Sequence, residues 1–210
     1  MAPLDVIAPG AGPQSSPDVG ERRYATLAIV LHWTIAALIV LQMCLGWYMN
    51  EILPDHSPAQ ARIEGLHISI GLTTFLLILV RIGIRLTHPA PPLPAALKPW
   101  EVVLAHASHL LFYLLMLALP LTGWALVSIH AQPISLWGLT WPHLPGLRGL
   151  AAPDQRPTRQ LLQHVHTTWL IWVTLANLAL HVAGALKHQF DGSPVLWRMA
   201  PFLRRPSQDR

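Results

Sequence analysis

The segment Glu64–Pro94, "EGLHISIGLTTFLLILVRIGIRLTHPAPPLP", decides the fold. It contains an apolar run long enough to cross a membrane as a helix, which takes about 20 residues. His67 stands near the start of the run, Arg81 and Arg85 stand near its end, and prolines close it. Ionisable side chains at membrane depth are costly and tend to be functional. The segment therefore predicts a membrane helix with chemistry at both ends.

Composition extends this prediction to the whole chain, which is 52% hydrophobic and 11% charged, whereas a soluble domain carries roughly 25% charged residues. Without alternating barrel strands, only helices satisfy the backbone in lipid. We expect an all-α fold, an integral membrane four-helix bundle over residues 24–201, between a disordered tail at 1–23 and a short tail at 202–210. No basic-aromatic pattern suggests a nucleic-acid partner. The predicted spans are Tyr24–Tyr48, Ile63–Leu86, Val102–Ile129 and Val165–Phe190.

The distribution of Lys and Arg predicts the orientation, because these residues concentrate on the cytoplasmic side of membrane proteins. One side would hold Arg22, Arg23, Arg81, Arg85, Lys98, Lys187, Arg198, Arg204, Arg205 and Arg210, and the other Arg62, Arg148, Arg156 and Arg159. Both termini are therefore expected in the cytoplasm, where the basic residues meet anionic membrane lipid. The long connection between the third and fourth spans contains "SLWGLTWPHLPGL". We expect this segment to lie against the outer headgroups, where Trp is favoured.

Histidines inside the spans form two pairs when they are matched by depth. His32 and His181 fall near the cytoplasmic side, and His67 and His166 near the outer side. His166 and His181 are 15 residues apart on the fourth span, a rise of about 22 Å and a net rotation of about 60°. One helix thus presents two imidazoles on a similar face near opposite membrane surfaces.

Paired imidazoles between helices are typical of haem ligation. Two such sites predict two b-type haems, and the absence of a CxxCH motif excludes covalently attached c-type haem. A zinc or di-iron site fits less well, because the spans offer no interior carboxylates. The alternative is that each histidine hydrogen-bonds a neighbouring backbone, which four histidines at paired depths make less favourable.

Arg81 and Arg85 lie one turn apart at the cytoplasmic end of the second span. Haem propionates take cationic partners near a membrane surface, so either arginine could bind one. Topology alone also places arginines at helix ends. Both interpretations stay open.

Five segments together resemble the bacterial cytochrome b561 family: "RYATLAIVLHW", "LHISIG", "LVRIGIRLTHPAPP", "AHASHLLFYLLMLALPLTG" and "LALHVAGALKHQF". The resemblance covers residues 23–201 in order. It implies a multi-pass protein of the bacterial inner membrane with two haem b groups, and it carries the ligand roles onto His32, His67, His166 and His181.

The fourth span departs from the family spacing, in which we expect the two ligands 14 residues apart. That step back from His181 lands on Thr167, which cannot ligate iron. A local bulge of the helix would bring His166 into register. His164 is the rival, and it lies further in rotation from the direction of His181 than His166 does.

The third span has two further features with predicted roles. His106 and His109 share a face, where they could line a quinone pocket, bind propionates or tie helices together. The motif "PLTG" at Pro120–Gly123 is expected to bend the helix and permit close packing.

Three functions remain open at this level. The resemblance implies an oxidoreductase that passes electrons from superoxide through the haems to ubiquinone. A relay subunit between a membrane-bound dehydrogenase, as redox partner protein, and quinone is the second, and a non-redox helical transporter is the third. Arg148, Arg156 and Arg159 against the single acid Asp154 in the outer connection lean toward an anionic substrate such as superoxide.

Overall fold

A computed structural model describes residues 23–94, 97–130, 133–147, 156–191, 195–200 and 202–203. Its elements are α1 (Thr26–Trp47), the π-helical turn η2 (Tyr48–Ile52), α2 (Pro58–Thr87), α3 (Pro99–Ile129), β1 (Ile134–Leu136), β2 (Leu139–Trp141), α4 (Arg156–His164), the π-helical turn η5 (Val165–Trp169), α5 (Leu170–Phe190) and the 3-10 turn η6 (Leu196–Arg198). Four continuous helical segments are long and apolar enough to cross a membrane, as predicted. The predicted tails lie almost wholly outside the described residues.

The second, third and fourth membrane-spanning helices begin earlier than the apolar runs that predicted them, whereas α1 begins two residues later, at Thr26 instead of Tyr24. Ser57 caps α2 by accepting a hydrogen bond from the Gln60 amide at 3.1 Å, with Pro58 at the first position. At the start of α3, the Glu101 carboxylate accepts from the Lys98 amide at 2.9 Å. The fourth span begins at Arg156 instead of Val165, because the polar residues of α4 continue the same helix. Hydropathy marks the hydrocarbon-embedded part of a helix, whereas capping marks its end.

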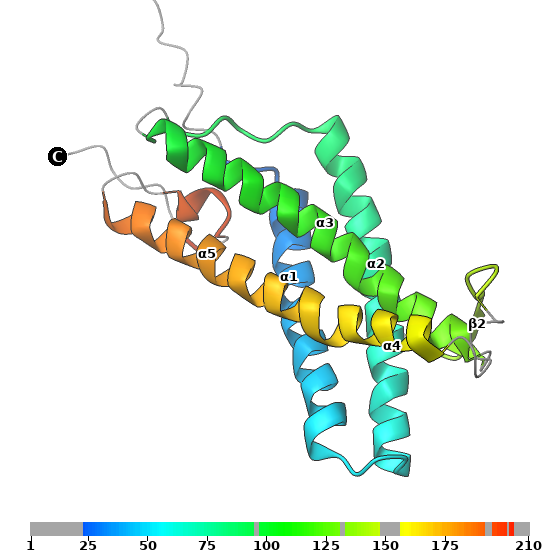
Figure 1. Ribbon diagram of the computed structural model, residues 1–210. Coiled ribbons are helices and arrows are strands. Elements are labelled where there is room, and N and C mark those ends of the chain that lie inside the picture. Colours follow the sequence, from blue (N-terminus) through cyan, green and yellow to red (C-terminus); the bar gives the residue numbers. More distant parts are fainter. Residues whose placement is uncertain are drawn as a thin grey trace, which may run out of the picture.

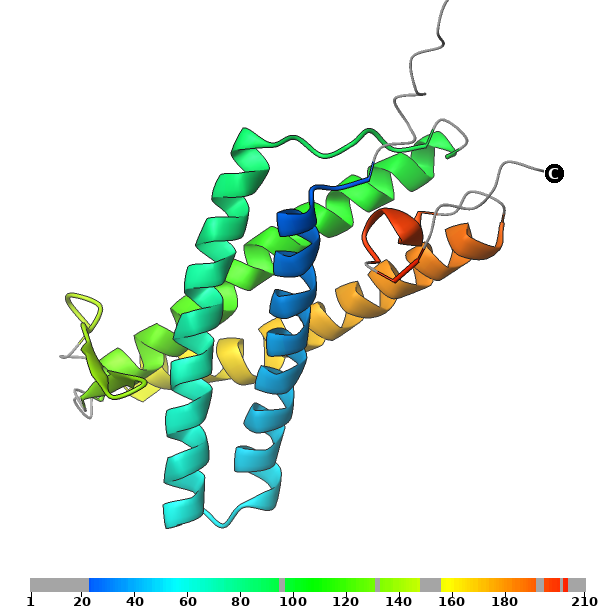
Figure 2. The ribbon, with the colours of Figure 1, turned by 180° about the vertical axis from the view of Figure 1, so that it is seen from behind.

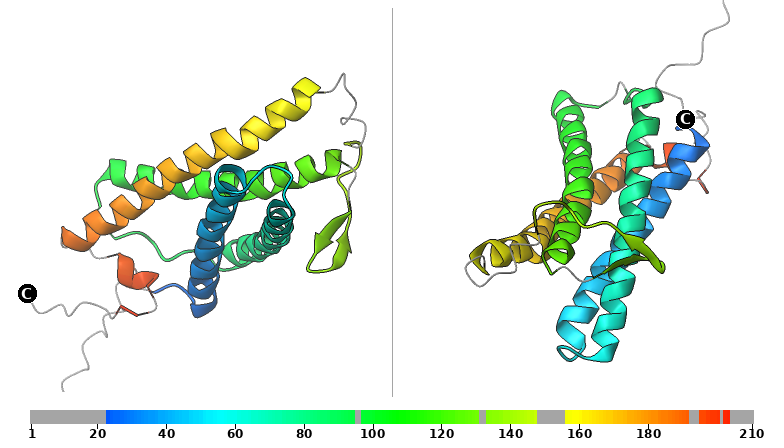
Figure 3. Two further views of the ribbon diagram at one scale, coloured as in Figure 1. Left: turned by 90° about the horizontal axis from the view of Figure 1, so that it is seen from below. Right: turned by 90° about the vertical axis from the view of Figure 1, so that its right-hand side faces the viewer.

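The helices form two antiparallel hairpins that cross at a wide angle. α1 and α2 make one hairpin, and α3 with the continuous α4–η5–α5 helix makes the other (Figure 1, and Figure 2 from behind). Seen along α1 and α2, the second hairpin lies across one side of the first (Figure 3, left). The buried apolar residues include Ile35 of α1, Leu72 and Ile78 of α2, and Leu115 of α3. Large apolar side chains such as Trp172 and Leu110 remain exposed around the outside, as lipid contact requires.

A small β-hairpin, β1 and β2, adds strand structure to the predicted all-α fold. Its turn contains Trp137 at φ 54° and Gly138 at φ 91°. The Trp137 indole donates to Thr73 Oγ1 at 2.9 Å, and the Ser69 hydroxyl donates to the Ser135 carbonyl at 3.0 Å. These bonds hold the hairpin along α2. Trp137 and Leu139 are exposed. Their exposure is compatible with contact between this segment and the lipid headgroups, which stays a prediction.

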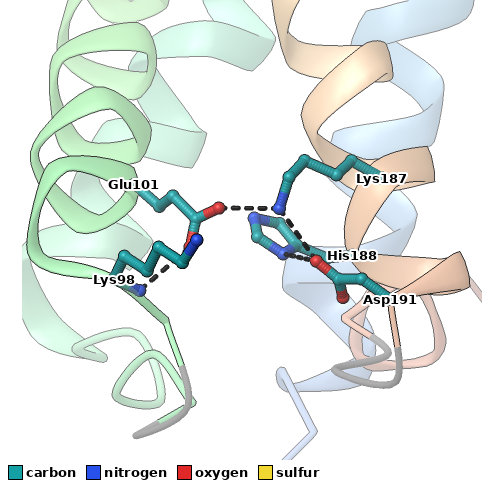
Figure 4. A network of polar contacts seen from close by, with 5 residues as sticks. All are labelled: Lys98, Glu101, Lys187, His188 and Asp191. Atoms are coloured by element: carbon teal, nitrogen blue, oxygen red, sulfur yellow. Dashed lines mark hydrogen bonds and ion pairs between the residues drawn. The ribbon is translucent and has the colours of Figure 1, made fainter.

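Ionic contacts join the start of α3 to the end of α5 (Figure 4). Lys187 Nζ lies 2.7 Å from the buried carboxylate of Glu101 and 2.8 Å from Asp191. Asp191 also lies 3.3 Å from His188 Nδ1. Deeper in the same helix pair, the Ser108 hydroxyl donates to Asn177 Oδ1 at 2.9 Å, and Asn177 Nδ2 donates to the Ser108 carbonyl at 3.1 Å. Polar contacts at two levels thus fix α3 against α5.

Candidate haem-binding sites

The structure brings together both predicted histidine pairs. His67 on α2 and His166 in η5 form the outer pair, with ring centroids 6.4 Å apart. His32 on α1 and His181 on α5 form the inner pair, with ring centroids 6.3 Å apart. Each pair therefore joins the two crossing hairpins.

The ring spacing of both pairs suits two ligands of one iron atom. Imidazoles on opposite sides of a metal ion, with metal–nitrogen bonds of about 2 Å, place their ring centres about 6 Å apart. Among the residues that the structure describes, no group of three or more His, Cys, Asp or Glu side chains is arranged to hold a metal ion. The donor set thus matches haem, which takes two axial ligands from the protein and its other four from the porphyrin.

The π-helical turn η5 is the local bulge that was predicted for the fourth span from the ligand spacing of the family. It covers Val165–Trp169 and contains His166, and such turns insert an extra residue into an α-helix and often mark functional sites. The imidazole of His166 faces His67. The rival His164 is exposed and packs its ring against Trp169, with centroids 5.7 Å apart. The bulge prediction is confirmed, and the structure places His166 beside His67.

Close contacts surround the outer pair. Thr122 Oγ1 lies 2.8 Å from His166 Nδ1, and a Cβ at Gly123 would come within 3.1 Å of His166 Cε1. This bears out the close packing predicted for "PLTG". A Cβ at Gly46 of α1 would lie 3.7 Å from His67 Cε1, and Gln42 Nε2 donates to the His67 carbonyl at 2.8 Å.

The sequence interpretation gave no site role to Gln42, Gly46 or Thr122. Gln42 carried a usable signal, because an amide in the middle of an apolar span needs a hydrogen-bond partner. His67 Nδ1 and Gln42 Oε1 are buried and have no hydrogen-bond partner among the residues that the structure describes. The two buried polar atoms beside this pair fit a site whose remaining contacts come from a bound group.

The inner pair has a different environment. Arg81 donates to His32 Nδ1 at 3.3 Å and to the Ala28 carbonyl at 3.1 Å. Arg85, one turn further along α2, is exposed and makes no hydrogen bond to the residues that the structure describes. The rings of His109 and Phe112 pack edge-on against His181, with centroids at 5.4 and 5.3 Å. Arg81 therefore contacts the inner pair directly through His32, whereas Arg85 lies one turn further from it and makes no hydrogen bond to either histidine of the pair.

His109 and His106 share a helix face but differ in the contacts that they make. His109 contacts the ring of His181 across the α3–α5 interface. His106 and His109 are both exposed, but no ring contact joins His106 to the described residues. For His109 the interpretation as a contact between helices is thus supported. The structure assigns no contact role to His106.

Comparisons with known proteins agree with this arrangement. The family model described as prokaryotic cytochrome b561 matches residues 23–202. A probable superoxide oxidase, CybB, of Yersinia pestis is 32% identical over 187 residues, covering 88% of this chain and 99% of that protein. Cytochrome b561 homolog 2 of Escherichia coli K12 is 29% identical over 179 residues, covering 84% of this chain and 90% of the homologue. The chain therefore belongs to the prokaryotic cytochrome b561 family, and is a multi-pass, b-type electron-transfer protein of the bacterial inner membrane.

Proposed function

We propose that this protein carries two b-type haems and uses them to move electrons from superoxide at the outer surface to ubiquinone in the membrane. The observation that carries the proposal is the presence of two histidine pairs. Their ring centroids are 6.4 and 6.3 Å apart, and the pairs lie at two depths of the continuous α4–η5–α5 helix. The similarity to a probable superoxide oxidase supports the choice of donor.

Each haem would supply a one-electron carrier, and the chain would hold each of the two haems through one pair of histidine ligands. His67 and His166 ligate the outer haem, and His32 and His181 the inner haem. The continuous α4–η5–α5 helix contributes one ligand to each haem, and the two ligands lie about 22 Å apart along the helix axis. This one helix therefore sets the distance between the two haems. Arg81 lies where it can bind a propionate of the inner haem.

The start of α4 supports an anionic donor. Arg156 and Arg159 are exposed there, and Arg159 precedes His166 by seven residues, or about two helical turns on the same side. Arg148 lies outside the described residues. Cations at this end attract a small anion toward the outer haem. Each superoxide ion would lose one electron and leave as O2, and two electrons with two protons would convert one ubiquinone to ubiquinol.

A quinol-formation assay tests the donor and acceptor. Purified holoprotein with ubiquinone and enzymatically generated superoxide should form quinol much faster than a haem-free preparation does. Replacing Arg156 and Arg159 together by Gln should slow this reaction, and the slowing should shrink at high salt because charge steering is screened. Haem reduction by dithionite should stay unchanged in that variant. Quinol formation no faster than in the haem-free control would reject superoxide and favour a relay between a dehydrogenase and quinone.

Haem counting tests the ligand assignment. His166→Ala should lose the outer haem and approach one haem per chain, because the inner pair keeps both of its ligands. His164→Ala should keep two haems, since His164 faces Trp169. Pyridine haemochrome assays on the two variants measure this directly. Loss of haem in His164→Ala with retention in His166→Ala would reassign the ligand to His164.

A further inference from the structure

We propose that Thr122, with Gly123 beside it, forms a seat on α3 that fixes the tautomer and orientation of His166 and thereby sets the reduction potential of the outer haem. The inference rests on the proposed role of His166 as a ligand of that haem. It gives "PLTG" a function in the redox site, in addition to helix packing.

Hydrogen-bond bookkeeping at Thr122 fixes the direction of the bond to His166. A threonine hydroxyl has one hydrogen to donate. That hydrogen is used within α3, because Thr122 Oγ1 lies 2.7 Å from the Ala118 carbonyl and 2.9 Å from the Leu119 carbonyl. At 2.8 Å from His166 Nδ1, the same oxygen therefore accepts. His166 carries its proton on Nδ1, and Nε2 presents a lone pair.

This tautomer is the one that an iron ligand needs. Histidines that bind a metal through one ring nitrogen usually donate the other N–H to a protein acceptor, which orients the ring and raises its basicity. Thr122 supplies such an acceptor from a different helix, α3, where the Leu119 carbonyl also lies within hydrogen-bonding reach of His166. The ring of His166 is thus prepared for iron before any haem arrives.

Gly123 completes the seat by leaving room for the ring. A Cβ at this position would come within 3.1 Å of Cε1, 3.6 Å of Nε2 and 3.7 Å of Nδ1 of His166. All three ring atoms lie next to the missing side chain, so the imidazole packs onto the backbone of α3. A larger residue would displace the ring from the Thr122 hydroxyl.

Other threonines show what a merely structural role would look like. Thr74 and Thr174 also donate to a carbonyl one turn earlier, at 2.7 Å in each case, a common way to satisfy a hydroxyl inside a helix. Both are buried, and neither hydroxyl contacts an imidazole among the described residues. Thr174 therefore provides a matched control for Thr122.

The test compares Thr122→Val, Thr122→Ser and Thr174→Val in the purified holoprotein. Valine has the shape of threonine but cannot accept, so the ferric form loses the support of a more basic ligand. The outer-haem potential should rise and its low-spin ferric EPR signal should shift, with the inner haem unchanged. Loss of a partner of this kind weakens metal-site affinity by about 10- to 100-fold, so the outer haem should also be lost more readily to a haem-binding competitor protein. Thr122→Ser and Thr174→Val should behave as wild type.

The measurements separate this inference from the function on which it rests. Unchanged outer-haem potential and EPR signal in Thr122→Val would overturn it, as would an equal change in Thr122→Ser or Thr174→Val. Redox titration and EPR use neither superoxide nor quinone, so failure of the proposed donor or acceptor leaves them readable. Retention of both haems in His166→Ala would instead reject the ligand assignment itself.

Discussion

At the scale of single residues, the two histidine pairs differ in how their rings are prepared for iron. His166 donates to Thr122, which leaves Nε2 free. At the inner pair, Arg81 can only donate, so the Nδ1 of His32 that it contacts at 3.3 Å accepts. Ligation through Nε2 of His32 requires the opposite tautomer. In the proposed ligation through Nε2, the Arg81 guanidinium would have to leave His32 Nδ1, and a propionate would be a suitable new acceptor.

A charge-removal experiment follows from this difference. Arg81→Gln should lower the reduction potential of the inner haem, because a nearby cation stabilises the reduced, less positive haem. Arg85→Gln should cause a smaller shift, since Arg85 is exposed and its charge is screened by solvent. Spectroelectrochemical titration resolves both haems, and the outer potential serves as the internal reference. Equal shifts in the two variants, or none in either, would return both arginines to a role in topology.

At the scale of elements, the bulge η5 shows how one inserted residue changes the direction in which a histidine points. A regular helix through Val165–Trp169 would rotate the residues on one side of it by about 100° relative to those on the other. The π-helical turn absorbs this rotation and sets His166 beside His67 while α5 keeps His181 beside His32. The comparison with the family spacing predicted a bulge, and the structure places it at His166.

The contacts between α3 and α5 yield a stability prediction. Glu101 both caps α3, through the Lys98 amide, and pairs with Lys187. Glu101→Gln keeps an acceptor for the amide but removes the charge, whereas Glu101→Ala removes both. The Tm of the holoprotein in detergent should therefore fall in the order wild type, Gln variant, Ala variant.

The matched control is Asp191→Asn, at the more exposed partner of Lys187. Its Tm should fall less than that of Glu101→Gln, because exposed ion pairs contribute little. An Ala variant as stable as the Gln variant would show that the cap adds nothing, and two variants as stable as wild type would show that neither contact matters.

At the scale of the whole molecule, the crossing of the two hairpins creates both sites. The first hairpin supplies His32 on α1 and His67 on α2, and the second supplies His166 in η5 and His181 on α5. α3 carries no assigned ligand, yet it contacts the ligands of helix four through Thr122, Gly123 and His109. In the proposed assignment, three helices supply the haem ligands and α3 positions the rings of two of them.

The sequence by itself determined the properties that depend on local order along the chain. Apolar length determined four spans, and residue spacing determined which histidines share a depth. The bulge in the fourth span was expected from the ligand spacing of the resembled family, and the structure contains it. These properties follow from a constant rise and rotation per residue. The helix starts at Pro58 and Arg156 were missed, because capping and polar helical turns leave no trace in hydropathy.

Only the tertiary structure decided the contacts between residues far apart in the chain. It placed Thr122 on His166, Arg81 on His32, His109 on His181 and the β-hairpin on α2. Each of these depends on the crossing angle of the hairpins and on the rotation of every helix about its axis. Both are set by how side chains interdigitate across the interface, so no spacing within one segment could reveal them.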